Sequence, residues 1–140
     1  MTAGKLLDGL KNNGFRLTNI RTKLVHLFAE TRMPLSVEEL IRALEKQGIT
    51  ANKTTIYREL AFLMEQNIVT NVDFGDRKKR YESALGGHHH HLMCLRCSRV
   101  LDVTLSSDLK KDEQRIAKKN KFKIVSHSLE FFGLCNQCSS

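Results

Sequence analysis

The feature that most constrains the fold of this chain is a set of four cysteines in two matching pairs. Cys94 and Cys97 are separated by two residues, and Cys135 and Cys138 repeat that spacing. The sequence contains no other cysteine. A two-residue gap allows both thiolates of a tight turn to bind one ion, and two such turns complete a closed tetrahedral zinc site. We therefore expect a structural Zn²⁺ that holds the C-terminal half together.

The overall charge and the N-terminal segment suggest where such a chain acts. The 140 residues carry a net charge of +8, which suggests a polyanionic partner such as nucleic acid. Residues 1–10 lack the apolar run of a signal peptide, and no stretch approaches the ~20 apolar residues of a membrane span. We expect a cytoplasmic, reduced protein without membrane association. Two disulfides, typical of secreted chains, and free thiols are the alternatives to zinc.

The first half of the chain predicts helices followed by a hairpin. A first apolar stripe of Leu6, Leu7 and Leu10 ends at Asn13-Gly14. Second and third helices follow Thr18 and Ser36, which are typical helix caps, and a fourth helix starts near Asn52. Residues 68–73 and 80–83 then predict two strands joined by a turn. This order is typical of a winged helix-turn-helix domain, which we expect over residues 1–83.

The second half predicts a different architecture. Adjacent glycines predict a hinge at residues 84–87. Beyond it we expect a strand at 99–105, a charged helix capped by Ser107 and a long strand at 122–132. The fold class is therefore α+β, with a small α/β domain over residues 88–140.

Basic and polar side chains gather in the expected fourth helix and in the hairpin loop. Hydroxyls at a helix N-terminus favour phosphate, arginine can form two hydrogen bonds to guanine, and tyrosine can pack on thymine methyl groups. The alternatives are an ordinary amphipathic helix and a solvated charge run. The predicted DNA-contacting residues are Lys53, Thr54, Thr55, Tyr57 and Arg58 in the helix, Arg77, Lys78 and Lys79 in the loop, and Arg16 and Arg21 near the second helix.

Four consecutive histidines, residues 88–91, precede the first cysteine pair. Because side chains alternate along a strand, His89 and His91 would share one face, and His88 and His90 the other. Nitrogen and oxygen donors favour zinc, iron(II), manganese or nickel, so we predict a second, exchangeable and pH-sensitive metal site. The alternatives are a solvated polar strand and a core histidine at position 127. Further candidate ligands are Glu82, Asp102 and His127.

Together these residues resemble the ferric uptake regulator family of bacterial metal-dependent repressors. The resemblance implies an N-terminal winged-helix domain, a hinge and an α/β dimerisation domain, with a homodimer that binds an inverted-repeat operator in double-stranded DNA. The segments that carry it are Gly14-Phe15-Arg16-Leu17-Thr18 with Arg21, Thr55-Ile56-Tyr57-Arg58 with Leu60, Tyr81-Glu82, the histidine run with its cysteine pair, and His127-Ser128-Leu129-Glu130 with Gly133 and the second cysteine pair.

The resemblance also implies roles for the candidate ligands. The four cysteines match the structural zinc site of the family. The regulatory site of the family, for Fe²⁺, Mn²⁺ or Zn²⁺, is matched by Glu82, His89, His91 and Asp102. An additional metal site of the family is matched by His88, His90 and His127.

One departure leaves the sensed signal open. Iron- and peroxide-sensing members usually take a histidine from the loop before the third helix, where this chain has Met33-Pro34. Zinc-sensing relatives often have a cysteine near the position of Tyr81, and this chain has none there. A peroxide- or zinc-sensing member, and a regulator with structural zinc alone, remain alternatives. We expect no enzyme, because a closed four-thiolate site has no open position and no HExxH or Ser-His-Asp spacing occurs.

Overall fold

All four helices of the first half begin where a side chain caps them; the first is capped by Thr2, which accepts a hydrogen bond of 3.3 Å from the Lys5 backbone N–H, and the other three begin at predicted positions. In each case a side-chain oxygen accepts a hydrogen bond from a backbone N–H of the first turn, which the helix itself leaves without a partner. The cap distances are 3.2 Å from Arg21 N to Thr18 Oγ1, 3.2 Å from Glu39 N to Ser36 Oγ, and 2.9 Å from Thr55 N to Asn52 Oδ1. The predicted caps Thr18 and Ser36 and the start near Asn52 are confirmed.

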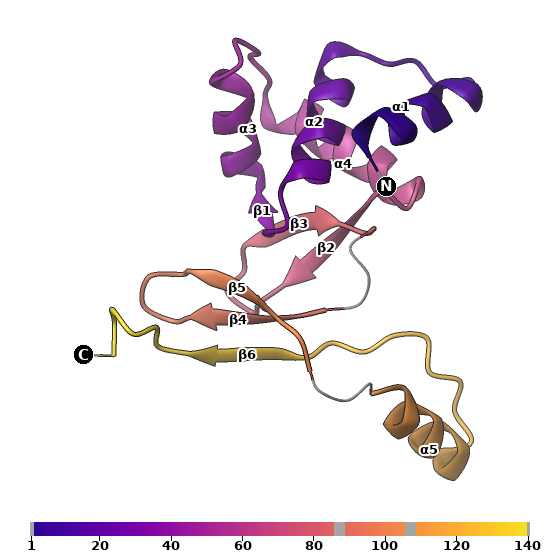
Figure 1. Cartoon of the computed structure of the whole chain (residues 1–140), viewed down its shortest axis with the longest axis vertical. Coiled ribbons are helices and arrows are strands. Elements are labelled where there is room, and N and C mark those ends of the chain that lie inside the picture. Colours follow the sequence, from indigo (N-terminus) through magenta and orange to yellow (C-terminus); the bar gives the residue numbers. More distant parts are fainter. Residues whose placement is uncertain (1, 86–88, 106–108, 140) are drawn as a thin grey trace. The chain divides into compact units, whose positions relative to one another are not determined.

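The computed structural model describes residues 2–85, 89–105 and 109–139. The chain divides into two compact units, Met1–Gly87 and His88–Ser140 (Figure 1). The predicted hinge at 84–87 stays a prediction, because residues 86 and 87 lie outside the described ranges. The first unit contains α1 (Ala3–Asn12), α2 (Asn19–Glu30), β1 (Leu35–Ser36), α3 (Val37–Glu45), α4 (Lys53–Glu65), β2 (Val69–Asp73) and β3 (Lys79–Ser83); the second contains β4 (His90–Cys94), β5 (Val100–Val103), α5 (Lys110–Asn120) and β6 (Glu130–Gly133).

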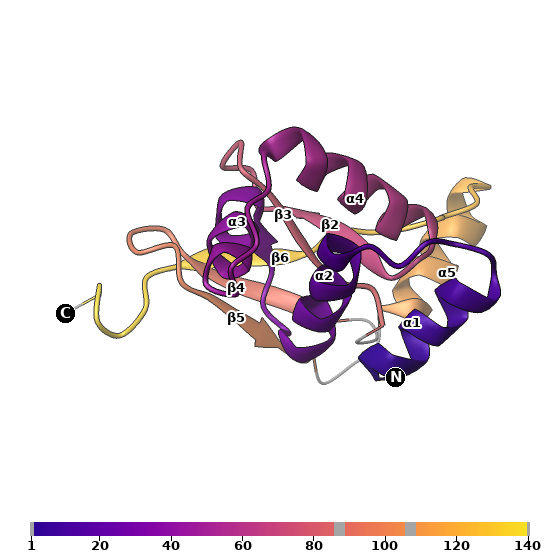
Figure 2. The same ribbon diagram turned by 90° about the horizontal axis from the view of Figure 1, so that it is seen from above.

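The first unit has a single apolar core beneath its helices. Leu24, Leu40, Ile56 and Leu60 are fully buried, and burial of one such side chain contributes roughly 1.5–3 kcal/mol. Figures 1 and 2 show α2, α3 and α4 grouped together beside the small antiparallel sheet, whose strand order is β1-β3-β2. Tyr81 on the central strand joins the core. This arrangement confirms the predicted winged helix-turn-helix.

The loop between β2 and β3 is the predicted wing. The two strands pair in register from Val69 opposite Ser83 to Asp73 opposite Lys79. At the turn, Asp73 Oδ1 accepts a hydrogen bond of 2.7 Å from the backbone N–H of Gly75, whose φ of 76° suits a residue without a side chain. The pairing of β2 with β3 therefore determines the position of the basic residues in the loop between them.

The second unit is built on a three-stranded sheet with the order β5-β4-β6. The central strand β4 is antiparallel to β5, with His91 opposite Asp102, and parallel to β6, with His91 opposite Glu130. The prediction of a long strand at 122–132 was wrong over most of its length, since only residues 130–133 pair with β4. Helix α5 confirms the predicted charged helix, while its expected cap, Ser107, lies outside the described residues.

This second unit has little apolar core of its own. Among its described residues the buried apolar side chains are Met93, Cys94 and Val100, and α5 buries none. Small domains with so little buried apolar surface usually depend on a metal, on disulfides or on oligomerisation. The cysteine cluster at one end of the sheet is therefore well placed to stabilise the unit.

Candidate metal centres and nucleic-acid interface

The four cysteines come together at the end of the β4–β6 pair. Cys94 is the last residue of β4, and the turn containing Cys135 follows β6. The four Sγ atoms all lie within 4.8 Å of one another, and Cys97 Sγ is 3.8 Å from Cys135 Sγ. A tetrahedral ion with Zn–S bonds of about 2.3 Å requires sulfur atoms about 3.8 Å apart. The cluster therefore fits Zn²⁺, and all four cysteines are free rather than disulfide-bonded.

The protonation of the cluster shows how it would receive an ion. Hydrogen bonds from the backbone of Cys97 and of Cys135 lower the pKa of the Cys94 thiol to about 6. The side-chain hydrogen bond with Cys135 raises the pKa of Cys138 to about 12, because that bond holds its proton. A dication would displace the retained proton, since zinc binds thiolates.

A second group of candidate ligands lies at the start of β4 and on β5. The ring nitrogens of His89 and His91 that face one another lie within 4.8 Å, and the two rings meet edge to face at 4.8 Å between centroids. Asp102 Oδ1 is 3.9 Å from Nε2 of His89 and 3.9 Å from Nε2 of His91. Two imidazoles and one carboxylate this close together could supply three ligands to a borderline divalent metal. The predicted alternation of the histidines thus brings three of the four expected regulatory ligands together.

The fourth expected ligand belongs to the other unit. Glu82 lies on β3, opposite Thr70 of β2, close to the end of the first unit. Its role as a ligand stays a prediction.

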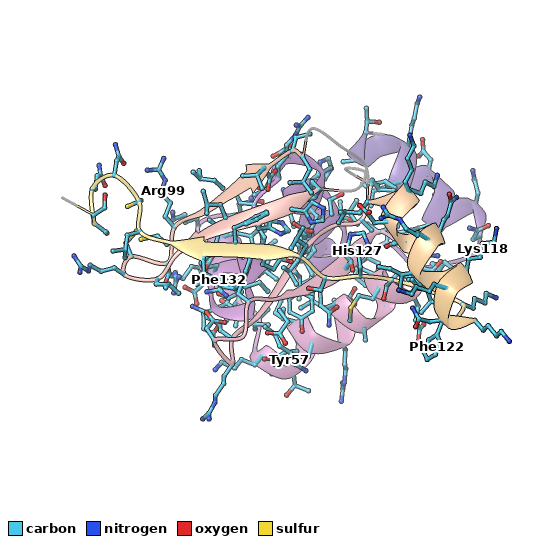
Figure 3. All side chains as sticks on the ribbon, turned by 90° about the horizontal axis from the view of Figure 1, so that it is seen from below. Tyr57, Arg99, Lys118, Phe122, His127 and Phe132 are labelled. Carbon is cyan, nitrogen blue, oxygen red and sulfur yellow. The ribbon has the colours of Figure 1, made fainter. Side chains whose placement is uncertain are left out.

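The additional metal site is only partly described. His88 lies outside the described residues. The rings of His90 and His127 lie 5.5 Å apart, and Nδ1 of His90 is 3.0 Å from the carbonyl oxygen of Leu129. His127 Nδ1 contacts a carboxylate oxygen of Glu113 on α5, and Figure 3 shows His127 beside that helix. His127, one of the predicted ligands of this site, therefore has an acidic neighbour, Glu113, that the sequence pattern did not predict.

The predicted DNA-contacting residues of α4 and of the wing are solvent-exposed, except Thr55, which is half-buried. Lys53, Thr54, Tyr57 and Arg58 are exposed on α4, and Figure 3 shows Tyr57 projecting from its helix. The wing residues Arg77, Lys78 and Lys79 are exposed as well. The start of α3, Tyr57 and residues 76–79 of the wing line a surface hollow of about 470 Å³. Helix α4 and the wing therefore border one continuous surface of this unit.

Comparison with known proteins identifies the family. The model of the "Ferric uptake regulator family" matches residues 12–132. The chain belongs to the ferric uptake regulator family. It is 32% identical over 130 residues to the ferric uptake regulation protein of Bordetella parapertussis, covering 92% of this chain and 93% of that protein.

Two solved ferric uptake regulators share the fold. The Helicobacter pylori regulator, described as having three functional metal binding sites, superposes with a TM-score of 0.83 at 24% identity, covering 100% of this chain and 95% of that one. The Vibrio cholerae regulator, described as showing a rearrangement of its DNA-binding domains, gives a TM-score of 0.76 at 29% identity, covering 91% and 98%.

The loop before α3 contains Met33-Pro34, where the resemblance led us to expect a departure from the family pattern. Pro34 is buried in the first unit and directly precedes β1. Neither Pro34 nor Met33 has a side-chain nitrogen, so this loop supplies no imidazole. His26, the histidine of the first unit, lies exposed on α2.

The predicted DNA contact of Arg21 stays a prediction, and the Arg21 side chain contacts other residues of the first unit. Its guanidinium forms an ion pair with Glu59 at 2.9 Å and is only 15% exposed. Its neighbour in the sequence motif, Arg16, is exposed as expected.

Proposed function

We propose that this ferric uptake regulator family member is a metal-responsive repressor that acts in the cytoplasm as a homodimer on an inverted-repeat operator. The observation that carries the proposal is the convergence of His89, His91 and Asp102 in the unit that follows a winged-helix domain. The same unit would then have two kinds of metal site: a histidine and carboxylate site whose ion exchanges and acts as the signal, and a closed four-cysteine site whose ion stabilises the fold. In the described residues, no helix is long and apolar enough to cross a membrane.

The regulatory ion would be Fe²⁺, Mn²⁺ or Zn²⁺, held by His89, His91 and Asp102, with Glu82 as the ligand from the first unit. A metal that binds one arrangement of the units more tightly than the others increases the population of that arrangement. The four cysteines would hold a separate structural Zn²⁺ throughout. His90 and His127, with the undescribed His88, would bind an additional ion.

Contacts to DNA would come from α4 and the wing. Arg58 and Tyr57 would meet base edges in the major groove, while the wing cations would meet the adjacent phosphates. The complete proposed set is Arg16, Lys53, Thr54, Thr55, Tyr57, Arg58, Arg77, Lys78 and Lys79.

A homodimer is supported by the exposed face of the second unit's sheet. Leu92 on the central strand lies opposite Leu101 on β5 and Phe131 on β6. These three side chains are 37%, 41% and 40% exposed, so they form an apolar row across the whole sheet. A second copy of the same sheet would cover this row, and two linked recognition helices would then match a two-fold symmetric site.

The deciding experiment compares DNA binding with and without metal. A duplex is selected from a random-sequence library with the wild-type protein, and its affinity is measured in chelator and with added Fe²⁺, Mn²⁺ or Zn²⁺. We expect one of these metals to tighten binding by roughly 5–150-fold, the usual range of allosteric coupling. His89→Ala with His91→Ala should abolish the increase, whereas His26→Ala, an exposed histidine of α2, should not. Equal affinity under every metal would leave a regulator with structural zinc alone.

A further inference from the structure

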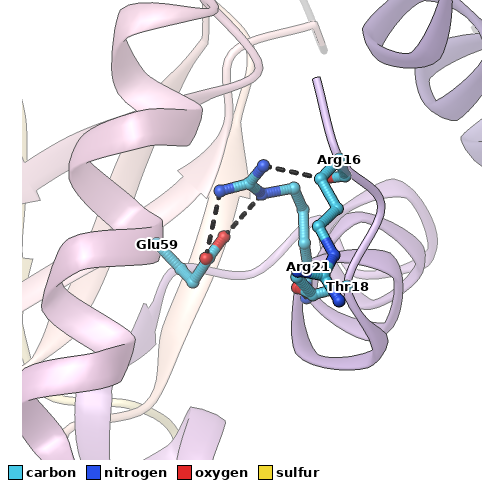
Figure 4. Close-up of polar contacts among 4 residues, drawn as sticks. All are labelled: Arg16, Thr18, Arg21 and Glu59. Carbon is cyan, nitrogen blue, oxygen red and sulfur yellow. Dashed lines mark hydrogen bonds and ion pairs between the residues drawn. The ribbon is translucent and has the colours of Figure 1, made fainter. Parts of the chain in front are cut away.

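The guanidinium of Arg21 connects three separate segments of the first unit (Figure 4). Nε and Nη2 donate to the two carboxylate oxygens of Glu59 on α4, at 2.9 and 3.1 Å. Nη1 donates to the carbonyl oxygen of Arg16, in the segment before α2, at 2.8 Å. A two-pronged arginine–carboxylate pair of this kind fixes direction as well as distance.

An aromatic ring completes this contact. The guanidinium carbon of Arg21 lies 3.7 Å from the centre of the Phe62 ring, and Phe62 in turn meets Phe15 edge to face at 5.0 Å. Glu59 and Phe62 are three residues apart on α4, so one turn of that helix holds both the edge and the face of the guanidinium. The side chains of Arg21 and Glu59 are 15% and 14% exposed, which limits screening by water and salt.

The other end of Arg21 is equally constrained. Its backbone N–H donates to the side chain of Thr18, which caps α2. Arg21 therefore links the start of α2 to the middle of α4, the helix whose first two turns carry Tyr57 and Arg58. In contrast to those exposed residues, Arg21 would have to break its contacts with Glu59 to reach a phosphate.

We propose that Arg21 and Glu59 are positioning residues that hold α4 at the angle required to read DNA, and that Arg21 does not itself contact DNA. This inference rests on the proposed function. Two features follow from it. Loss of either partner weakens binding to the preferred sequence, and the number of phosphates contacted stays the same.

The test uses Arg21→Lys, Arg21→Gln, Glu59→Gln and the Arg21→Lys, Glu59→Gln double variant of the full chain, with the exposed ion-pair residue Asp112 changed to Asn as the matched control. Affinities are measured for the duplex selected by the wild-type protein and for a scrambled duplex, over a range of salt concentrations. Melting temperatures establish that each variant is folded.

If Arg21 and Glu59 position the helix, each single change weakens binding to the selected duplex by about tenfold, and the double variant is no worse than either, because contacting residues are not additive. Binding to the scrambled duplex and the salt slope stay unchanged. Lysine retains a positive charge for a phosphate but cannot form the two-pronged pair, so the Arg21→Lys result separates the two roles.

Other outcomes overturn the inference. If Arg21 is a phosphate contact, Glu59→Gln leaves binding unchanged or tighter, and Arg21→Gln lowers the salt slope by about 0.9. If the pair matters only for stability, melting temperatures fall while the ratio of selected to scrambled binding is preserved. A wild-type protein that selects no duplex overturns the proposed function and, with it, this inference.

Discussion

Glu130 Oε2 lies 3.0 Å from Nδ1 of His91, on the neighbouring strand of the same sheet. On the other side of β4, Asp102 approaches Nε2 of the same ring at 3.9 Å. The His91 imidazole thus has one nitrogen committed to Glu130 and the other directed toward the candidate metal position. A carboxylate on the far nitrogen of a ligating histidine fixes its tautomer and orientation, and makes it a better donor.

We predict that Glu130→Ala weakens binding of the regulatory metal by about 10- to 100-fold, the usual cost of losing such a partner. Isothermal titration calorimetry with Mn²⁺, on protein that retains its structural zinc, measures this affinity directly. Glu45→Ala, at the exposed end of α3, is the matched control. Unchanged Mn²⁺ affinity in Glu130→Ala would show that Glu130 has no part in the site.

The cysteine cluster leads to a prediction about metal content. Cys138→Ser removes one of four thiolates, so purified protein should lose its tightly held zinc, and the second unit should lose secondary structure because its apolar core is small. The helices of the first unit should persist, since Leu24 and Ile56 are fully buried there. Elemental analysis and circular dichroism report the two effects. Full zinc retention would contradict the four-cysteine assignment.

Zinc binding by the cluster should also depend on pH in a definite direction. Below a pH of about 6, where the lowered pKa of Cys94 lies, protons compete with zinc for the Cys94 thiolate. At neutral pH zinc must still displace the proton held by Cys138, whose pKa is raised to about 12. Competition with a chromophoric chelator should therefore show weaker zinc binding as pH falls, with proton release on binding. Affinity that does not change with pH would exclude thiolate ligands.

Local signals in the sequence were sufficient for the helices of the first unit. Thr18 and Ser36 each cap a helix through a backbone N–H three residues away, so their role depends little on the rest of the fold. The spacing of the cysteine pairs is a local signal of the same kind, and it correctly indicated one four-sulfur cluster.

Features that depend on distant pairing were not accessible in this way. The parallel pairing of β6 with β4 begins only at Glu130. This tertiary pairing makes the strand shorter than predicted and places Glu130 opposite His91. Likewise, nothing local to the motif containing Arg21 shows that Glu59, 38 residues later, accepts hydrogen bonds from its guanidinium.

The wing offers a prediction about stability and pH. Burial alone would raise the pKa of Asp76, but hydrogen bonds from the Arg80 side chain and the Lys78 backbone outweigh it and lower the pKa below its ordinary 3.8. Arg80 is almost fully buried and lies over the ring of Phe74 at 5.1 Å. Asp76→Asn should therefore destabilise the first unit by at most about 1 kcal/mol at neutral pH.

The sign of this effect follows from the lowered pKa. The contribution of Asp76 is fully present above its ordinary pKa of 3.8 and is lost as pH falls through the lower value of the folded state. Urea unfolding of wild type and Asp76→Asn should accordingly converge in acid and differ at neutral pH. Asp8→Asn, an exposed carboxylate of α1, should show no such difference. A gap between wild type and Asp76→Asn that widens in acid would contradict the assignment.

The apolar row on the second sheet makes the dimer testable by a single change. Leu101→Glu places a charge in the row formed with Leu92 and Phe131, and a two-fold dimer carries the change twice. Burial of each leucine at the interface stabilises the dimer by about 1.5–3 kcal/mol, and the dimer loses two of them, so its dissociation constant should rise by at least about 100-fold. Analytical ultracentrifugation measures it. Leu85→Glu is the matched control, because Leu85 has the same 41% exposure but belongs to the first unit. A Leu101→Glu variant as dimeric as wild type would assign the exposed row to something other than a second copy.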